Sequence, residues 1–265
     1  MVTAVVVVVT KSLLISTIVS TLATIFMSVL FIILTREFVS EKNALSVKKT
    51  IKQLLVTAPL CIGAFLTIYI GAAPRNSIDK LLDDEMQAIY GFISMPVFVV
   101  QLAVLFLFNP ILHKVSVLWN EKKYSEYAKE TIKQSALVIG VTIICLAGAW
   151  LLGIPVLSAL YSTDLAPYKA DLLIMMLGSG FLGFVSLLGY LLTVMRYQNA
   201  ILGGYGAVAL LALFFTDKAV EADQIHGACV FYMILLLTLM TIFVGLYLIA
   251  YFRAKHRNAV AVADD

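Results

Sequence analysis

Charged residues are scarce in this chain, and their placement is more informative than their number. Asp, Glu, Lys and Arg make up 13% of the 265 residues, whereas a soluble domain carries about 25% because its surface must contact water. Seven runs of 20 to 30 residues contain none of the four. The runs span residues 12–35, 54–73, 88–112, 134–163, 172–195, 197–216 and 227–252. This deficit excludes a soluble globular protein.

Each run is long enough to cross a bilayer as a helix, since a hydrocarbon core of about 30 Å needs about 20 residues. The strands of a membrane β-barrel are about ten residues long and alternate in polarity, whereas these runs are apolar all round. We therefore predict an all-α, polytopic transmembrane helical bundle with about seven transmembrane helices.

Motifs that carry chemistry are also missing. The three cysteines fall inside apolar runs without CxxC or CxxH spacing, which argues against a disulfide framework or a metal site. The sequence has no HExxH, Walker or GxSxG motif and no paired carboxylates within the runs. We predict that the chain is not an enzyme and that it binds no cofactor and no metal ion.

The charges that are present alternate between the links. Lys and Arg number five in each of the first and third links, one in the fifth and three in the tail, a total of 14. The second, fourth and sixth links together contain four. Cytoplasmic segments of membrane proteins carry the excess of Lys and Arg. The pattern predicts a multi-pass protein of the cytoplasmic membrane with its C-terminus in the cytoplasm.

We expect three parts along the chain: residues 1–53 with one transmembrane helix and a basic cytoplasmic linker, a six-helix lobe at 54–252, and a cytoplasmic tail at 253–265. Residues 2–10 form an apolar stub that is too short to span a bilayer. The stub fits either an interfacial or mobile end or a chain that lacks an N-terminal half. Residues 114–133 mix aromatic residues with five lysines, which predicts a helix lying along the lipid headgroups.

Glycine and proline interrupt several runs. Pro155 closely follows Gly153, and a proline bends a helix because it lacks the amide donor and clashes one turn back. Gly178, Gly180 and Gly183 lie in the fifth run. These glycines favour close packing of helices, and hinges for alternating access are the second interpretation.

Candidate binding residues are few. Arg75 and Asp79 lie at the outer end of the second run, and they share a face if the helix continues past Pro74. A guanidinium binds an anionic pyrophosphate through its planar fork of donors, although an exposed ion pair is the simpler interpretation. Gln101 lies near the middle of the third run, where it faces either a packing partner or a cavity. We predict Arg75, Asp79 and Gln101 as substrate-binding candidates.

Several segments together resemble a known family. The segments are LLVTAPL at 54–60, YIGAAPRNSIDK at 69–80, AIYGFISMP at 88–96, GIPVLSALY at 153–161, LTVMR at 192–196 and HGAC at 226–229. They resemble the oligosaccharide flippases, or polysaccharide biosynthesis proteins, of the MATE-like multidrug/oligosaccharidyl-lipid/polysaccharide exporter superfamily. The resemblance covers roughly four-fifths of the chain, from residue 54 to the end.

The resemblance implies a fold and an activity. Family members have two lobes of six helices around a central cavity, so this chain would contain the last helix of the first lobe and the whole second lobe. The implied activity is the movement of lipid-linked oligosaccharide across the cytoplasmic membrane for cell-surface polysaccharide biosynthesis. The implied partners are the lipid bilayer, the lipid-linked saccharide and a missing N-terminal half, with no nucleic acid.

Other classes remain as alternatives. An ion-coupled drug or metabolite exporter of the same superfamily is the first, although the seven runs lack the carboxylate that coupling usually needs. A retinal protein fits less well, because the last run has no lysine for a Schiff base. A membrane-embedded transferase also fits less well, because the links are short and the runs contain no acidic cluster.

Overall fold

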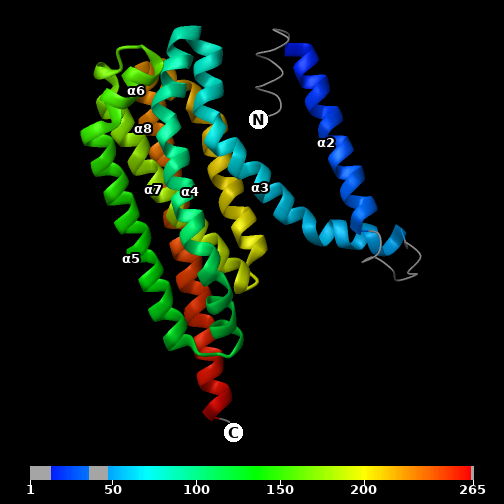
Figure 1. The fold of residues 1–265 in the computed structure, drawn as a ribbon. Helices are drawn as coiled ribbons and strands as arrows, with labels where there is room; N and C mark the ends of the chain where they lie inside the picture. Colours follow the sequence, from blue (N-terminus) through cyan, green and yellow to red (C-terminus); the bar gives the residue numbers. More distant parts are fainter. Residues whose placement is uncertain (1–12, 36–46, 264–265) are drawn as a thin grey trace. The chain divides into compact units, whose positions relative to one another are not determined.

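The computed structural model describes residues 13–35 and 47–263, and within these ranges every element is a helix (Figure 1). The elements are α2 (Leu13–Thr35), α3 (Val47–Leu81), α4 (Asp84–Asn120), α5 (Tyr124–Gly148), the π-helix η2 (Ala149–Gly153), α6 (Ile154–Tyr161), the 3-10 helix η3 (Ala166–Tyr168), α7 (Lys169–Val194) and α8 (Gln198–Ala263). The predicted all-α class is confirmed for the residues described. The apolar stub at 2–10 and residues 36–46 of the basic linker lie outside them.

The chain divides into two units, residues 1–54 and 55–265. Helix α2 belongs to the first unit and is strongly apolar, and the side chains of Phe26 and Phe31 are 66% and 68% exposed. An apolar helix of this length with exposed aromatic side chains is typical of one that contacts lipid. The second unit contains most of α3 and all the later helices.

Helix α8 consists of two antiparallel arms separated by a sharp turn. The backbone leaves the helical region at Asp223 (φ −152°, ψ 36°) and Gln224 (φ 44°, ψ −125°). The ring of Tyr205 on the first arm packs on Phe243 of the second, with centroids 5.1 Å apart. These two rings are nearly equally far along the chain from the turn, as antiparallel arms require. The sixth and seventh predicted runs are the two arms of α8.

The second unit places three of its links at one end of the bundle, which we call the Asp223 end (Figure 1). The α3–α4 turn and the α6–α7 link meet there, since the hydroxyl of Tyr168 lies 3.7 Å from the sulfur of Met86. The turn of α8 lies at the same end, because Asp217 pairs with Lys80 of α3.

The α4–α5 turn, the α7–α8 turn and the C-terminal part of α8 lie at the opposite end, which we call the Arg196 end (Figure 1). The hydroxyl of Tyr251 donates a hydrogen bond to the carbonyl of Tyr124 at 3.2 Å, which ties α8 to the start of α5. Successive links of the second unit therefore alternate between the two ends.

Two turns at the Arg196 end share one geometry. Lys122 and Arg196 both have a left-handed backbone, with φ of 59° and 65°. The amide of Arg196 donates to the carbonyl of Thr193, and the amide of Tyr197 donates to that of Leu192 at 2.9 Å. This is the Schellman C-cap, which usually has glycine at the left-handed position. The predicted turn at Arg196 is confirmed.

Helix α7 is the central helix of the second unit, and 13 of its 26 residues are buried. A methyl group on Gly180 would overlap the side chain of Thr142 on α5, and one on Gly178 would lie 3.2 Å from the ring of Tyr232 on α8. A methyl group on Gly183 would lie 3.2 Å from Val104 of α4 and 3.3 Å from Val138 of α5. Small residues let helix backbones approach closely. The contacts support the close-packing interpretation of these glycines, and the hinge interpretation stays a prediction.

Four helical segments of the described residues are long and apolar enough to cross a membrane. The segments are Asp84–Val104, Tyr124–Tyr161, Ala166–Val194 and Gln198–His256. The last one contains both arms of α8 and therefore counts two predicted runs as one. Large apolar side chains also remain exposed, for example Phe106 at 73% and Ile144 at 72%. These features indicate a helical membrane protein, and the number of seven crossings stays a prediction.

The helix predicted along the lipid headgroups at 114–133 is wrong. Helices α4 and α5 cover this segment except for residues 121–123, so it consists of two helix ends joined by a tight turn. The physical reason is that its buried residues continue the faces of the long helices. Tyr127, Thr131 and Gln134 are buried at spacings of four and three residues, which keeps one face of α5 against the bundle.

Candidate functional site

The structure places Arg75 and Asp79 on the surface of α3 at the Asp223 end. The helix continues past Pro74, as the shared face requires, and both side chains are exposed. The ion pairs among the described residues do not join Arg75 to Asp79. Instead, Asp79 accepts a hydrogen bond from Nε2 of Gln87 at 2.6 Å across the α3–α4 turn. Asp79 therefore connects α3 to α4.

Gln101 is half-buried on α4. It lies 17 residues after Asp84, the first residue of α4, which is about 25 Å along the helix axis at 1.5 Å per residue. The structure therefore does not bring Gln101 together with Arg75 and Asp79 in one site.

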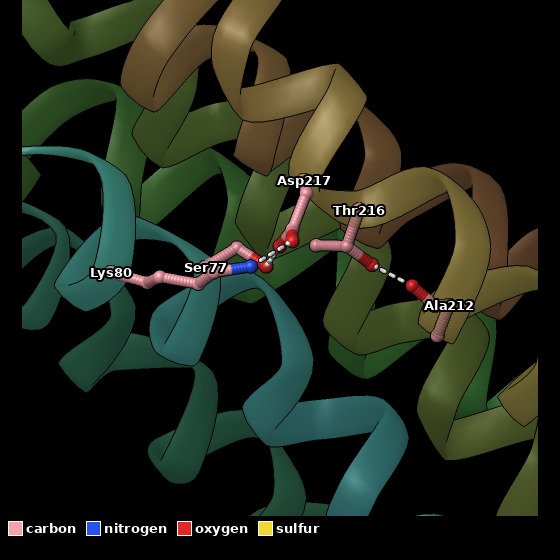
Figure 2. A network of polar contacts seen from close by, with 5 residues as sticks. All are labelled: Ser77, Lys80, Ala212, Thr216 and Asp217. Atoms are coloured by element: carbon pink, nitrogen blue, oxygen red, sulfur yellow. Dashed lines mark hydrogen bonds and ion pairs between the residues drawn. The ribbon is translucent and has the colours of Figure 1, made fainter.

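A polar cluster joins α3 to the first arm of α8 (Figure 2). Ser77 Oγ and Lys80 Nζ each donate to a different carboxylate oxygen of Asp217, both at 2.6 Å. The hydrogen bond from Lys80 and the charge of Asp217 raise the pKa of the lysine. Thr216 turns away from the cluster and donates to the carbonyl of Ala212 inside its own helix at 2.5 Å. Because Lys80 is 67% exposed, the cluster connects two helices at the surface and encloses no site.

A second polar pair at the Asp223 end contains a buried carboxylate. Asp171 is 6% exposed in the first turn of α7. Its Oδ1 lies 2.5 Å from Nδ1 of His226, just after the turn of α8. The imidazole side chain is 46% exposed, so the pair connects the interior of the bundle to its surface. The pair therefore ties the first turn of α7 to the second arm of α8.

A third polar cluster lies at the Arg196 end. Lys114 Nζ donates to Glu130 Oε2 at 2.7 Å, and Gln134 Nε2 donates to Glu130 Oε1 at 3.1 Å. Glu130 and Gln134 are buried. This cluster ties α4 to α5 through charge-assisted hydrogen bonds.

A cleft of about 240 Å³ opens between α3, α7 and α8. Its polar lining residues are Thr67, Ser186, Thr193, Gln198 and Tyr205. We call it the hydroxyl-lined cleft. Four hydroxyl groups and one amide among otherwise apolar lining residues make it a candidate site for a polar ligand.

The hydroxyls of the cleft are oriented by their own helices. Those of Thr67, Ser186 and Thr193 each donate to the carbonyl four residues earlier, at 2.8 or 2.9 Å. A hydroxyl that donates in this way still has lone pairs that accept a hydrogen bond. Tyr205 lies across the cleft, 3.8 Å from the Cβ position of Gly63 on α3 and 4.0 Å from that of Gly189 on α7. The cleft therefore offers several acceptors beside one aromatic ring.

Sequence reasoning missed both Asp171 and the cleft. Asp171 precedes the apolar run at 172–195, so the sequence interpretation assigns it to an outer link. Helical spacing was the signal available, because Asp171 lies four and eight residues before Met175 and Ser179, which are buried on the same face of α7. The cleft had no such signal, since its residues come from three helices distant in sequence.

The described residues contain no group of three His, Cys, Asp or Glu side chains that could hold a metal ion. Comparisons with protein-family models, curated proteins and solved structures found no match to this chain. The class of the protein therefore rests on its fold, which is that of a helical membrane protein with the small hydroxyl-lined cleft between its helices.

Proposed function

We propose that this chain is a membrane transport protein that moves lipid-linked oligosaccharide across the cytoplasmic membrane, as the resemblance to the MATE-like oligosaccharide flippases implies. The observation that carries the proposal is the hydroxyl-lined cleft. A saccharide presents many hydroxyl groups, and inside an apolar bundle these groups need protein partners in place of water. The cleft supplies such partners.

Each polar residue of the cleft has a role in this proposal. Gln198 offers a donor and an acceptor to a sugar, and the three aliphatic hydroxyls offer acceptors. Tyr205 offers its ring face to the apolar face of the sugar, and Phe243 holds the ring from behind. Arg75, exposed at the Asp223 end, binds the pyrophosphate when it arrives on that side.

The cleft is smaller than a usual ligand site, which favours a larger cavity shared with a second lobe. Sites for small molecules usually measure about 300–1,000 Å³, and the cleft measures about 240 Å³. It therefore encloses part of an oligosaccharide. We propose that an N-terminal half, as the resemblance implies, completes the cavity.

The proposed topology has seven crossings with the Arg196 end in the cytoplasm. Lys and Arg residues are more numerous there, and cytoplasmic segments carry this excess. Those of the Arg196 end are Lys114, Lys122, Lys123, Lys129, Lys133, Arg196, Arg253 and Lys255, whereas the Asp223 end has Arg75, Lys80, Lys169 and Lys218.

The test is the amount of lipid-linked saccharide on the inner leaflet in cells that lack the full-length gene. We expect accumulation after deletion, and rescue by the wild-type protein. A variant that combines Thr67→Val, Thr193→Val and Tyr205→Phe removes three cleft hydroxyls at nearly constant volume, so we expect it to restore transport poorly.

The matched control is Thr238→Val on the second arm of α8. Its hydroxyl also donates to the carbonyl four residues earlier, at 2.8 Å, but it does not line the cleft. This variant should rescue fully. The flippase proposal fails if deletion causes no accumulation, and the role of the cleft fails if the triple variant rescues as well as the control.

An ion-coupled exporter is the second candidate, and the Asp171–His226 pair is the observation that favours it. Ion coupling usually needs a carboxylate inside the bundle, and Asp171 is a buried carboxylate. In that case Asp171→Asn abolishes ion-dependent efflux from vesicles. Asp164→Asn, at an exposed carboxylate in the link before α7, should leave it unchanged. Efflux that persists in the Asp171 variant would remove this candidate.

A further inference from the structure

A second hollow lies between α5 and α7, on a different face of α7 from the cleft. It measures about 450 Å³. Its walls are apolar side chains such as Ile143 and Ala147 of α5 and Leu173 and Leu177 of α7, and Trp150 lies in the same lining. We call it the apolar groove. It is an open recess in the surface of the bundle, and its volume is large enough to hold part of a molecule.

The groove lies beside the seam where α5 and η2 both pack closely on α7, since a methyl group on Gly153 of η2 would lie 2.7 Å from Leu172 of α7. In the same seam, Thr142 of α5 packs on Gly180 of α7. Two turns further along, residues Ala149–Gly153 form a π-helix ahead of Pro155. A proline lacks an amide donor and clashes with the preceding turn, and a wider π turn accommodates it. This turn carries Trp150, whose side chain is 55% exposed at the groove.

An unneutralised cation lies at one end of the groove. Lys169 Nζ lies 5.1 Å from the centroid of the Trp150 ring. The ammonium group is exposed and takes part in none of the ion pairs among the described residues. Lys169 and Leu177 are eight residues apart on α7, or about 12 Å along its axis. The groove therefore has apolar walls along its length and the positive charge of Lys169 at one end. Tryptophan and lysine side chains, such as Trp150 and Lys169, are typical of the headgroup level of a membrane.

We propose that the apolar groove binds an anionic phospholipid of the bilayer, with one acyl chain in the groove and the phosphate at Lys169. The lining offers no polar side chain other than the indole of Trp150, so a saccharide or a peptide backbone would lose its hydrogen bonds there. The positive charge at the end favours a headgroup with net negative charge. The inference does not depend on the proposed function, because the groove and the cleft share no lining residue.

The experiment uses the full chain, purified in detergent, with native mass spectrometry of retained phosphatidylglycerol and phosphatidylcholine. We expect one tightly retained phosphatidylglycerol and weaker binding of phosphatidylcholine. Lys169→Gln should lower the affinity for phosphatidylglycerol about fivefold. Ala147→Phe fills the groove and should abolish preferential retention.

The chain offers a matched control for each variant. Lys218 also lies over an aromatic ring, at 5.4 Å from the Phe215 centroid at the same end of the bundle, but neither Lys218 nor Phe215 lines the apolar groove. Lys218→Gln should therefore leave binding unchanged. Ala207 is exposed on the first arm of α8. Ala207→Phe therefore adds the same bulk away from the groove and should leave the retention of phosphatidylglycerol unchanged.

Several results would overturn the proposal. Equal binding of the two lipids would remove the headgroup preference, and equal losses in the Lys169 and Lys218 variants would indicate general attraction of anionic lipid. Displacement of phosphatidylglycerol by a polyprenyl phosphate would assign the groove to a substrate lipid. If Ala147→Phe fails to fold, the Lys169 and Lys218 variants decide the question alone.

Discussion

Gly227 on the second arm of α8 lies directly against the main chain of Ala219 on the first arm, because a methyl group on Gly227 would overlap the carbonyl oxygen of Ala219. A backbone oxygen cannot rotate aside as a flexible side chain does. A larger residue at position 227 therefore requires the main chain beside the turn to shift.

We expect Gly227→Ala to destabilise the protein by about 1–3 kcal/mol, the usual cost of overpacking a close contact. The measurement is the midpoint of thermal unfolding of the purified protein in detergent. Gly245→Ala on the second arm is the control, because a methyl group there meets open space. Equal midpoints for the two variants would contradict the close contact.

The contact between α5 and α7 gives a second prediction. Gly180→Ala should lower stability because the new methyl group overlaps Thr142, and Thr142→Ala in the same chain should recover most of the loss. Gly140→Ala, which meets nothing within 4 Å, should be neutral or mildly stabilising. A double variant no more stable than Gly180→Ala alone would place the clash elsewhere.

The left-handed backbone of Arg196 gives a third prediction. Arg196→Gly removes the steric cost of φ 65° but adds chain entropy to the unfolded state, so we expect little change in stability. Arg196→Val should cost about 1–2 kcal/mol, because a β-branched residue tolerates this conformation poorly. Unfolding curves of the two variants test this, and a valine variant as stable as the glycine one would exclude the Schellman turn.

The Asp171–His226 pair gives a fourth prediction. His226→Ala leaves a buried carboxylate without its partner and should cost about 1–3 kcal/mol. Adding Asp171→Leu should restore much of this, since the unpaired charge is then removed. Lys80→Met breaks an exposed pair and should barely change the unfolding midpoint. If His226→Ala is as mild as Lys80→Met, the carboxylate is better solvated than its burial indicates.

The orientation of the chain is the fifth prediction. In a variant without native cysteines, a cysteine at Lys122 should react with a membrane-impermeant thiol reagent only after the cells are opened. A cysteine at Asp223 should react in intact cells. Both residues are exposed and lie at opposite ends of the second unit. Labelling of Lys122→Cys from outside would invert the proposed topology.

Much of the fold follows from local properties of the sequence. Absence of charge over 20 or more residues defines where helices lie, since the main-chain groups of an apolar segment in lipid must bond to one another. The turn at Arg196 is also local, because a basic residue followed by Tyr197 and Gln198 interrupts two apolar runs that are too long for one crossing.

Other features depend on which helices become neighbours, and no local pattern contains that information. The lysines and aromatic residues at 114–133 predicted a surface helix, yet the segment consists of two helix ends, and its Tyr124 and Tyr127 contact Tyr251 and Tyr247 of α8. The closeness of Asp171 to His226, 55 residues away, exists only once α7 packs on α8. The cleft and the groove likewise form where α7 meets different neighbours. Hydrophobicity is a property of one segment, whereas burial and pairing are properties of several segments together, which is why the sequence predicted the helices and only the packed bundle showed its sites.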